Sequence, residues 1–145
     1  MSKRILFVDE EDWSITPYFD KLRDNSSEVD LAIDGDEAID LLQKNKYDLL
    51  VLDIMFPPGQ KIGNNVEPRK AGAILLYRIR YNEIPDMKTT SNIPVVVITA
   101  VTDQKLLEDV KQLGVNEVFL KPASFDQVTD ALLELVNVNE VKKNE

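Results

Sequence analysis

Five short apolar runs alternate with longer amphipathic segments along the chain. The most apolar run, 49–52, holds four consecutive aliphatic residues. An unbroken aliphatic run is typical of a parallel strand covered on both faces, because a strand with one face in water alternates apolar and polar residues. Together the runs predict five strands: 4–8, 28–33, 49–52, 93–98 and 117–120.

Helical spacing of apolar residues fills the segments between these strands. Pro17 is tolerated only in a first turn, so the first helix is expected to begin late. Gly114 is a typical helix stop, and Ser124 is a good N-cap for a last helix. Four segments repeat apolar residues every three or four positions: 13–23, 37–44, 71–81 and 103–113.

Strands that alternate with helices predict an α/β fold, doubly wound, with one five-stranded parallel sheet and helices on both faces. With 145 residues, 43% of them hydrophobic, the chain fits one domain with a substantial core. We expect this domain to cover 1–138 and a polar C-terminal tail to cover 139–145. Segment 56–70 has three prolines, two glycines and no clear periodicity, so a long loop is expected there.

The amino-acid composition and the net charge exclude several classes of function. The chain contains no Cys and no His, which excludes disulfides, thiolate or imidazole catalysis and the common zinc sites. Its formal net charge of -9 argues against direct DNA binding and against an anionic membrane surface. Because no apolar run approaches the length of a membrane span and no signal peptide opens the chain, we expect a cytoplasmic protein.

Polar residues that carry chemistry follow four of the predicted strands. Asp9 and Glu10 follow the first strand, Asp53 the third, Thr99 the fourth and Lys121 the fifth. The carboxyl ends of parallel strands meet at one edge of a sheet, where ligands collect. Carboxylates that converge there repel one another unless a cation lies among them, and ligands that are all oxygen favour Mg²⁺. The pattern therefore predicts a magnesium-dependent phosphate site.

Asp53 is placed to act as a nucleophile that forms an acyl phosphate. Lys121 would neutralise charge on the phosphoryl oxygens, and the Thr99 hydroxyl would donate to one of them. Each component alone also has a structural explanation: Asp53 as the cap of the following turn, Asp9 to Asp12 as a solvated turn that caps a helix, Thr99 as the end of a strand, and Lys121 as a snorkelling surface side chain. Their combination at matching strand ends favours the functional interpretation.

Together these residues resemble the receiver domain of two-component response regulators, the CheY-like family with a flavodoxin-like fold. The resemblance covers nearly the whole chain, from Arg4 to about Val138. It implies the strand order 2-1-3-4-5. It rests on four motifs: Val8-Asp9-Glu10, Asp48 to Met55 with Pro57, Thr99-Ala100 and Lys121-Pro122.

The resemblance also implies roles. Asp53 would accept a phosphoryl group from a histidine kinase or a histidine phosphotransfer protein. Mg²⁺ would be held by Glu10, Asp53, the Met55 backbone carbonyl and, through water, Asp9. The chain would then promote only its own phosphorylation and dephosphorylation, and would pass the signal to an unknown downstream protein target.

The chain departs from the family pattern at three places. Val118 stands where the family usually carries an aromatic residue, and Phe119 is expected to face the other side of the strand. The loop after Asp53 is about a dozen residues longer than usual, with the next helix beginning near Gly72. No effector domain follows the last helix, so a stand-alone receiver is expected.

Two other functions compete with this hypothesis. An aspartate-nucleophile phosphatase usually needs a second acid two residues after the nucleophile, where this chain has Met55. A receiver-like module that is not phosphorylated would bind a partner, for which the long loop offers a surface. A homodimer through a hydrophobic face near Val118 is a further expectation.

Overall fold

The structure is a computed structural model that describes residues 2–144, with side chains described for residues 2–137. All five strands are parallel and form one sheet in the order β2-β1-β3-β4-β5. The predicted fold and the strand order 2-1-3-4-5 are therefore confirmed. The strands are β1 (Lys3–Val8), β2 (Ser27–Ala32), β3 (Leu49–Leu52), β4 (Val95–Thr99) and β5 (Glu117–Leu120).

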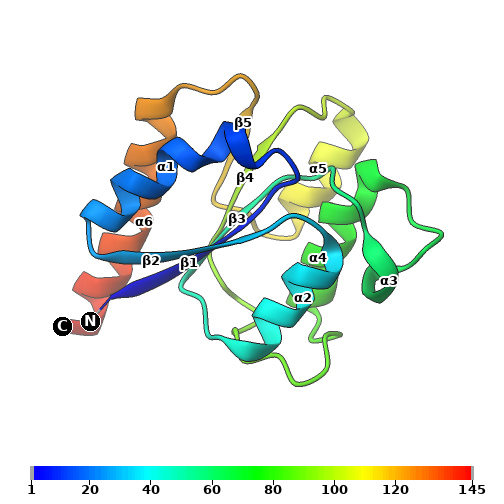
Figure 1. Cartoon of the computed structure of the whole chain (residues 1–145), viewed down its shortest axis with the longest axis horizontal. Helices are drawn as coiled ribbons and strands as arrows, with labels where there is room; N and C mark the ends of the chain where they lie inside the picture. The colour runs from blue at the N-terminus through cyan, green and yellow to red at the C-terminus, as the bar shows by residue number, and fades with distance from the viewer. Residues whose placement is uncertain (1, 145) are drawn as a thin grey trace.

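Helices cover both faces of the sheet, with α1 and α6 on one face and α2, α4 and α5 on the other (Figure 1). The helices are α1 (Asp12–Asp24), α2 (Gly35–Lys44), α3 (Gly59–Ile62), α4 (Ala71–Arg80), α5 (Gln104–Gln112) and α6 (Phe125–Asn144), with a 3-10 turn η1 (Pro68–Lys70). None of them, over residues 2–144, is long and apolar enough to cross a membrane.

The last helix runs further than the sequence predicts. Helix α6 ends at Asn144, so its backbone passes through most of the segment 139–145 that was expected as a polar tail. The side chains of that segment and residue 145 lie outside the described residues. The boundary at 138 therefore stays a prediction.

Side chains alternate between two hydrophobic cores along the central strands. On β3, Leu50 and Leu52 face α2, α4 and α5, while Leu49 and Val51 face α1 and α6. All of β3 is buried, as expected for a parallel strand covered on both faces. On β5, Val118 packs on the first core and Phe119 on the second, which confirms that these two residues face opposite sides.

Helix α1 corrects the prediction about Pro17. The helix begins at Asp12, so Pro17 lies in its second turn and not in its first. Proline has no N–H, which removes the usual donor to the Trp13 carbonyl four residues earlier. The Thr16 hydroxyl donates to that carbonyl instead, at 3.4 Å. This local substitute allows the helix to continue through the proline.

Segment 56–70 is more ordered than the predicted loop and folds as an insertion that contains α3 and η1. The Asp36 carboxylate of α2 accepts the N–H of Lys61 at 2.8 Å. The Arg78 guanidinium of α4 donates to the carbonyls of Lys61 and Ile62, both at 2.8 Å, and the Ile62 side chain is buried. The insertion is therefore anchored to α2 and α4, beside the sheet (Figure 1).

Gly72 marks where the insertion returns to the sheet. Its N–H donates to the Ile54 carbonyl at 2.8 Å. A Cβ at this position would lie 2.4 Å from the Asp53 carbonyl oxygen and 2.6 Å from the Ile54 Cα. Only glycine lets α4 approach the backbone beside Asp53 this closely.

Replacing Gly72 with alanine should therefore destabilise the chain by about 1–3 kcal/mol, because the added methyl group overpacks rigid backbone. Helix propensity alone would give the opposite sign, since alanine is favoured over glycine by about 0.5–1 kcal/mol inside a helix. Urea unfolding measures both this variant and the control Ala73→Gly, for which a loss near the propensity value is expected. A Gly72→Ala variant more stable than the wild type would contradict the close approach.

Candidate functional site

Two acidic residues are fixed at the carboxyl edge of the sheet by backbone pairing that continues past the strands. Directly after β1, the Asp9 N–H donates to the Ala32 carbonyl at 3.0 Å. Directly after β3, the Asp53 N–H donates to the Val8 carbonyl at 2.9 Å. Since β1 and β3 are neighbours, the pairing brings two carboxylates from distant segments to one place.

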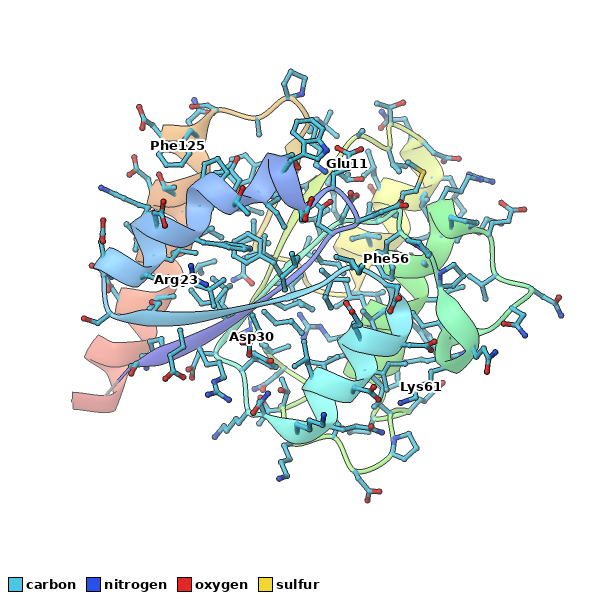
Figure 2. All side chains as sticks on the ribbon, viewed as in Figure 1. Glu11, Arg23, Asp30, Phe56, Lys61 and Phe125 are labelled. Atoms are coloured by element: carbon cyan, nitrogen blue, oxygen red, sulfur yellow. The ribbon has the colours of Figure 1, made fainter. Side chains whose placement is uncertain are left out.

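The side chain of Lys121, which follows β5, reaches both carboxylates. Its Nζ lies 3.0 Å from Asp9 Oδ2 and 3.2 Å from Asp53 Oδ2. A third acid, Glu11, is 4.0 Å away at the start of α1, at this end of the molecule (Figure 2). Asp9 is 3% exposed and Asp53 7% exposed. An ammonium therefore bridges two buried carboxylates.

Each of these carboxylates also holds its own turn. Asp9 Oδ1 accepts the N–H of Glu11 at 2.8 Å, and Asp53 Oδ1 accepts the N–H of Met55 at 3.2 Å. One oxygen of each group thus orients the side chain, and the other faces Lys121. Asp53 therefore caps the turn after β3 with one oxygen and contacts Lys121 with the other.

Burial sets the electrostatics of this group. Desolvation raises the pKa of Asp9, and the nearby charge of Asp53 adds to the rise, while the hydrogen bond from Lys121 opposes it. Burial lowers the pKa of Lys121, but the hydrogen bond to Asp9 and the charges of Asp53 and Asp9 outweigh burial and raise it overall. Lys121 is therefore held as a cation, whereas the ionised form of Asp9 is costly.

Thr99 ends β4 and is fully buried. Its Oγ1 accepts the N–H of Val101 at 3.2 Å, and its carbonyl accepts the N–H of Lys121 at 2.8 Å. Among the residues whose side chains are described, the Thr99 hydroxyl makes no hydrogen bond to Asp9, Asp53 or Lys121. The structure thus joins Thr99 to the site through the backbone of Lys121.

The magnesium ligands predicted from the sequence differ in how exposed they are. Glu10 is exposed in the bend after Asp9, and Met55 is 43% exposed. Within residues 2–137, no group of three or more acidic side chains is close enough to hold a metal ion. The donors themselves, carboxylates of Asp9, Glu10 and Asp53 with the Met55 carbonyl, are all oxygen and fit the chemistry of a hard cation.

A groove beside Lys121 was not predicted from the sequence. Its volume is about 500 Å³, and its walls include Trp13 and Tyr18 from α1 and Ala100 from the segment after β4. Tyr18 stacks on Phe125 of α6, with ring centroids 5.4 Å apart and planes at 7°. Nothing in the sequence indicated that Tyr18 lines a groove, because only the packing of α1 against α6 brings the two rings together. Trp13, which is 73% exposed, is the groove residue that the sequence could have indicated, because a large aromatic side chain is unusual at the surface.

Comparison with known proteins supports what the geometry indicates. The response regulator receiver domain family matches residues 5–133. Sporulation initiation phosphotransferase F of Bacillus subtilis is 25% identical over 133 residues, which are 91% of this chain and 92% of that protein. Transcriptional regulatory protein DltR of Streptococcus agalactiae is 26% identical over 125 residues, 86% of this chain but 48% of DltR. Hybrid signal transduction histidine kinase B of Dictyostelium discoideum is 24% identical over 134 residues, and the chain spans only 6% of its length.

Solved structures show the same fold. A CheY-like response regulator receiver domain protein from Methanospirillum hungatei superposes with a TM-score of 0.74 at 18% identity, covering 98% of this chain and 99% of that one. The receiver domain of the Francisella response regulator 1452 gives a TM-score of 0.72 at 23% identity, covering 95% and 99%.

The fold and the acidic site define a CheY-like signalling domain of the two-component class. The chain belongs to the response regulator receiver domain family.

The raised pKa of Asp9 makes a prediction about stability. Folded Asp9 takes up a proton at a higher pH than unfolded Asp9, so its contribution to stability is complete below the unfolded pKa, about 3.9, and is lost as pH rises through the folded pKa. The Asp9→Asn variant cannot ionise at this position, so it does not lose this stability. Its free energy of unfolding, relative to that of the wild type, should therefore increase between pH 4 and pH 7.

Urea unfolding of both chains at several pH values measures the difference. The control is Asp130→Asn, which changes an exposed carboxylate on α6. A difference between wild type and Asp9→Asn that stays constant with pH, or shrinks toward pH 7, would show that Asp9 is not strained by burial.

Proposed function

We propose that the chain is a phosphoacceptor of a two-component phosphorelay, and that Asp53 takes its phosphoryl group from a phosphohistidine. The donor would be a histidine kinase or a histidine phosphotransfer protein. One observation carries the proposal: the buried Asp53 carboxylate lies at the carboxyl edge of the sheet within 3.2 Å of the Lys121 ammonium. A nucleophile and the cation that neutralises its product are already in contact.

The reaction follows from this contact. A carboxylate oxygen of Asp53 forms a bond to phosphorus as the bond from phosphorus to the donor imidazole nitrogen breaks. The electron pair leaves on the imidazole, and the product is an acyl phosphate on Asp53. Lys121 keeps its charge because its pKa is raised, so it is available to the phosphoryl oxygens throughout.

Magnesium belongs to this proposal as a bound cofactor. Glu10, Asp53, the Met55 carbonyl and, through water, Asp9 would hold it, and all of these are oxygen donors. When bound, the ion offsets negative charge on the carboxylates and the phosphoryl group. The high cost of ionised Asp9 fits such a role, because a carboxylate strained by burial gains from a second cation.

The response of the domain would start at Thr99. The hydroxyl of Thr99 is buried and uses only a weak acceptor contact with the Val101 N–H, which leaves its proton free to turn toward a phosphoryl group. That movement would pull the segment after β4 and shift α5. Because Val118 stands where the family usually carries an aromatic residue, the change would pass mainly through this segment to a downstream protein target.

The relatives support a phosphorelay without naming a target. Sporulation initiation phosphotransferase F matches along nearly its whole length, so a role in phosphoryl relay is the natural comparison. DltR is a transcriptional regulatory protein, but the match spans only about half of it. A DNA-binding output is therefore not part of this proposal. In the proposed function, the chain would act only on its own acyl phosphate.

The wild-type chain, incubated with Mg²⁺ and acetyl phosphate, should gain one base-labile phosphoryl group, whereas Asp53→Asn should gain none. Intact mass measures the gain. Asp130→Asn, an exposed carboxylate on α6, is the matched control and should load like the wild type. Lys121→Gln should load at least about tenfold more slowly, because one charge-assisted contact to the phosphoryl group is lost.

A chain that takes no phosphoryl group from acetyl phosphate or from a phosphohistidine donor would sink the proposal. The receiver-like binding module would then be the better explanation. Loading of Asp53→Asn at the wild-type level would instead place the acceptor elsewhere. The phosphatase reading has no support at the site, since Met55 occupies the place of the second acid.

A further inference from the structure

The insertion 56–70 makes a charged contact with the segment after β4 that the proposed function does not use. Arg69 of η1 donates from Nη1 to Asp103 Oδ2 at 3.3 Å, across 34 residues of chain. Asp103 is the N-cap of α5, and its other oxygen, Oδ1, accepts the Leu106 N–H at 3.1 Å. A single carboxylate therefore joins the insertion to the first turn of α5.

The Arg69 side chain extends from a part of the chain that is anchored independently of α5. Its Nε donates to Glu67 Oε2 at 2.9 Å, which orients the guanidinium. The Pro68 carbonyl accepts the Phe56 N–H at 3.2 Å, so η1 is tied to the segment after β3. The Phe56 side chain is fully buried in the core. Arg69 thus holds the start of α5 from a fixed position.

Segment 100–103, between β4 and α5, has few other attachments. The Val101 N–H donates to Thr99 Oγ1 at 3.2 Å, and the partly buried Val101 side chain packs on the core beneath α4 and α5. Within residues 2–137, the contact with Arg69 is the one hydrogen bond or ion pair that joins this segment to an element other than β4 and α5. The position of the segment therefore depends on Arg69 more than on any other polar contact.

The two ends of α5, which packs beside α4 (Figure 1), are held unequally. At the C-terminal end, Arg80 of α4 donates to the carbonyls of Leu113 and Gly114, at 2.7 and 3.0 Å. Just beyond, Asn116 pairs twice with Val95 of β4: its N–H donates to the Val95 carbonyl at 2.8 Å, and its Oδ1 accepts the Val95 N–H at 3.0 Å. A movement of α5 should therefore pivot about its C-terminal end and displace its N-terminal end furthest.

The structure shows the segment in the position where the Thr99 hydroxyl contacts Val101 and not Asp53. We propose that Arg69 is a latch that holds segment 100–103 and the start of α5 in this position, and that its contact with Asp103 opens when Thr99 turns toward phosphorylated Asp53. The effect of the latch on signalling rests on the proposed phosphoacceptor function.

The geometry of the contact allows it to open with a small movement. Its length of 3.3 Å is already long for a hydrogen bond, and the contact of Arg69 with Glu67 limits how far the guanidinium can follow Asp103. Helix shifts of about 1–2 Å are common in switching proteins and would separate the two groups. A contact that is made in one position and lost in the other favours the first, which here is the unphosphorylated one.

The rate of loading from acetyl phosphate with Mg²⁺, followed by intact mass, measures the latch. Arg69→Gln should load about two- to fivefold faster than the wild type, which is the effect that an exposed ion pair can have on an equilibrium. Lys105→Gln is the matched control, because it removes the same charge and breaks an exposed pair with Asp109 inside α5. It should load like the wild type. Slower loading of Arg69→Gln, or an equal rise in both variants, would overturn the latch.

Asp103→Asn tests the other side of the contact. Asparagine caps a helix about as well as aspartate, so α5 should begin at the same residue while the ion pair is lost. This variant should load faster, as Arg69→Gln does, and the double variant should show no further rise. Additive effects of the two substitutions would contradict a shared contact.

Backbone amide relaxation dispersion, measured by NMR on the unphosphorylated chain, tests the restraint without any phosphoryl group. The amides of Val101 and Thr102 should show a larger exchange contribution in Arg69→Gln than in the wild type or Lys105→Gln, because the released segment visits its second position more often. Equal dispersion in all three chains would overturn the latch. A wild-type chain that takes no phosphoryl group would contradict the phosphoacceptor function instead, and the relaxation data would still decide whether Arg69 restrains the segment.

Discussion

The structure depends on one charged contact: the Lys121 ammonium between the buried carboxylates of Asp9 and Asp53. Two carboxylates at one sheet edge repel each other, and burial strengthens the repulsion by removing water. Lys121 offsets it while keeping its own charge. The contact joins the ends of β1, β3 and β5, so it also ties together three strands that are far apart in the chain. It explains how a stable fold tolerates two buried carboxylates at one edge of the sheet.

The two faces of the sheet present different side chains to the outside. On one face, α1 and α6 flank Lys121 with the aromatic groove of Trp13 and Tyr18. On the other, α4 is held by the insertion through Arg78 and presents its tyrosines to the outside. The insertion 56–70 does not stand free as a loop, because Asp36 of α2 accepts a hydrogen bond from its backbone and Arg78 of α4 donates one to it. The charged site around Lys121 and the exposed tyrosines of α4 therefore lie on different surfaces of the molecule.

Much of the fold was predictable because its signals are local. The aliphatic run 49–52 has one physical solution, a doubly covered strand, and the structure confirms it. Predictions of helix starts failed where a neighbouring side chain satisfied a backbone group. Pro17 is tolerated in the second turn of α1 because Thr16 supplies a donor, and α2 begins at Gly35 because Asp34 caps it. Propensity and periodicity do not report such partners.

The sequence by itself determined that Asp9, Asp53, Thr99 and Lys121 stand at strand ends, because the length of each apolar run sets where its strand stops. It also set the face of Val118 and Phe119, since side chains alternate along a strand. Tertiary structure decided which of these groups touch. Lys121 meets Asp9 and Asp53 but not the Thr99 hydroxyl, and Glu10 stays at the surface. These contacts depend on strand order and helix packing, which bring together side chains 68 and 112 residues apart, and no local pattern encodes a distance of that kind.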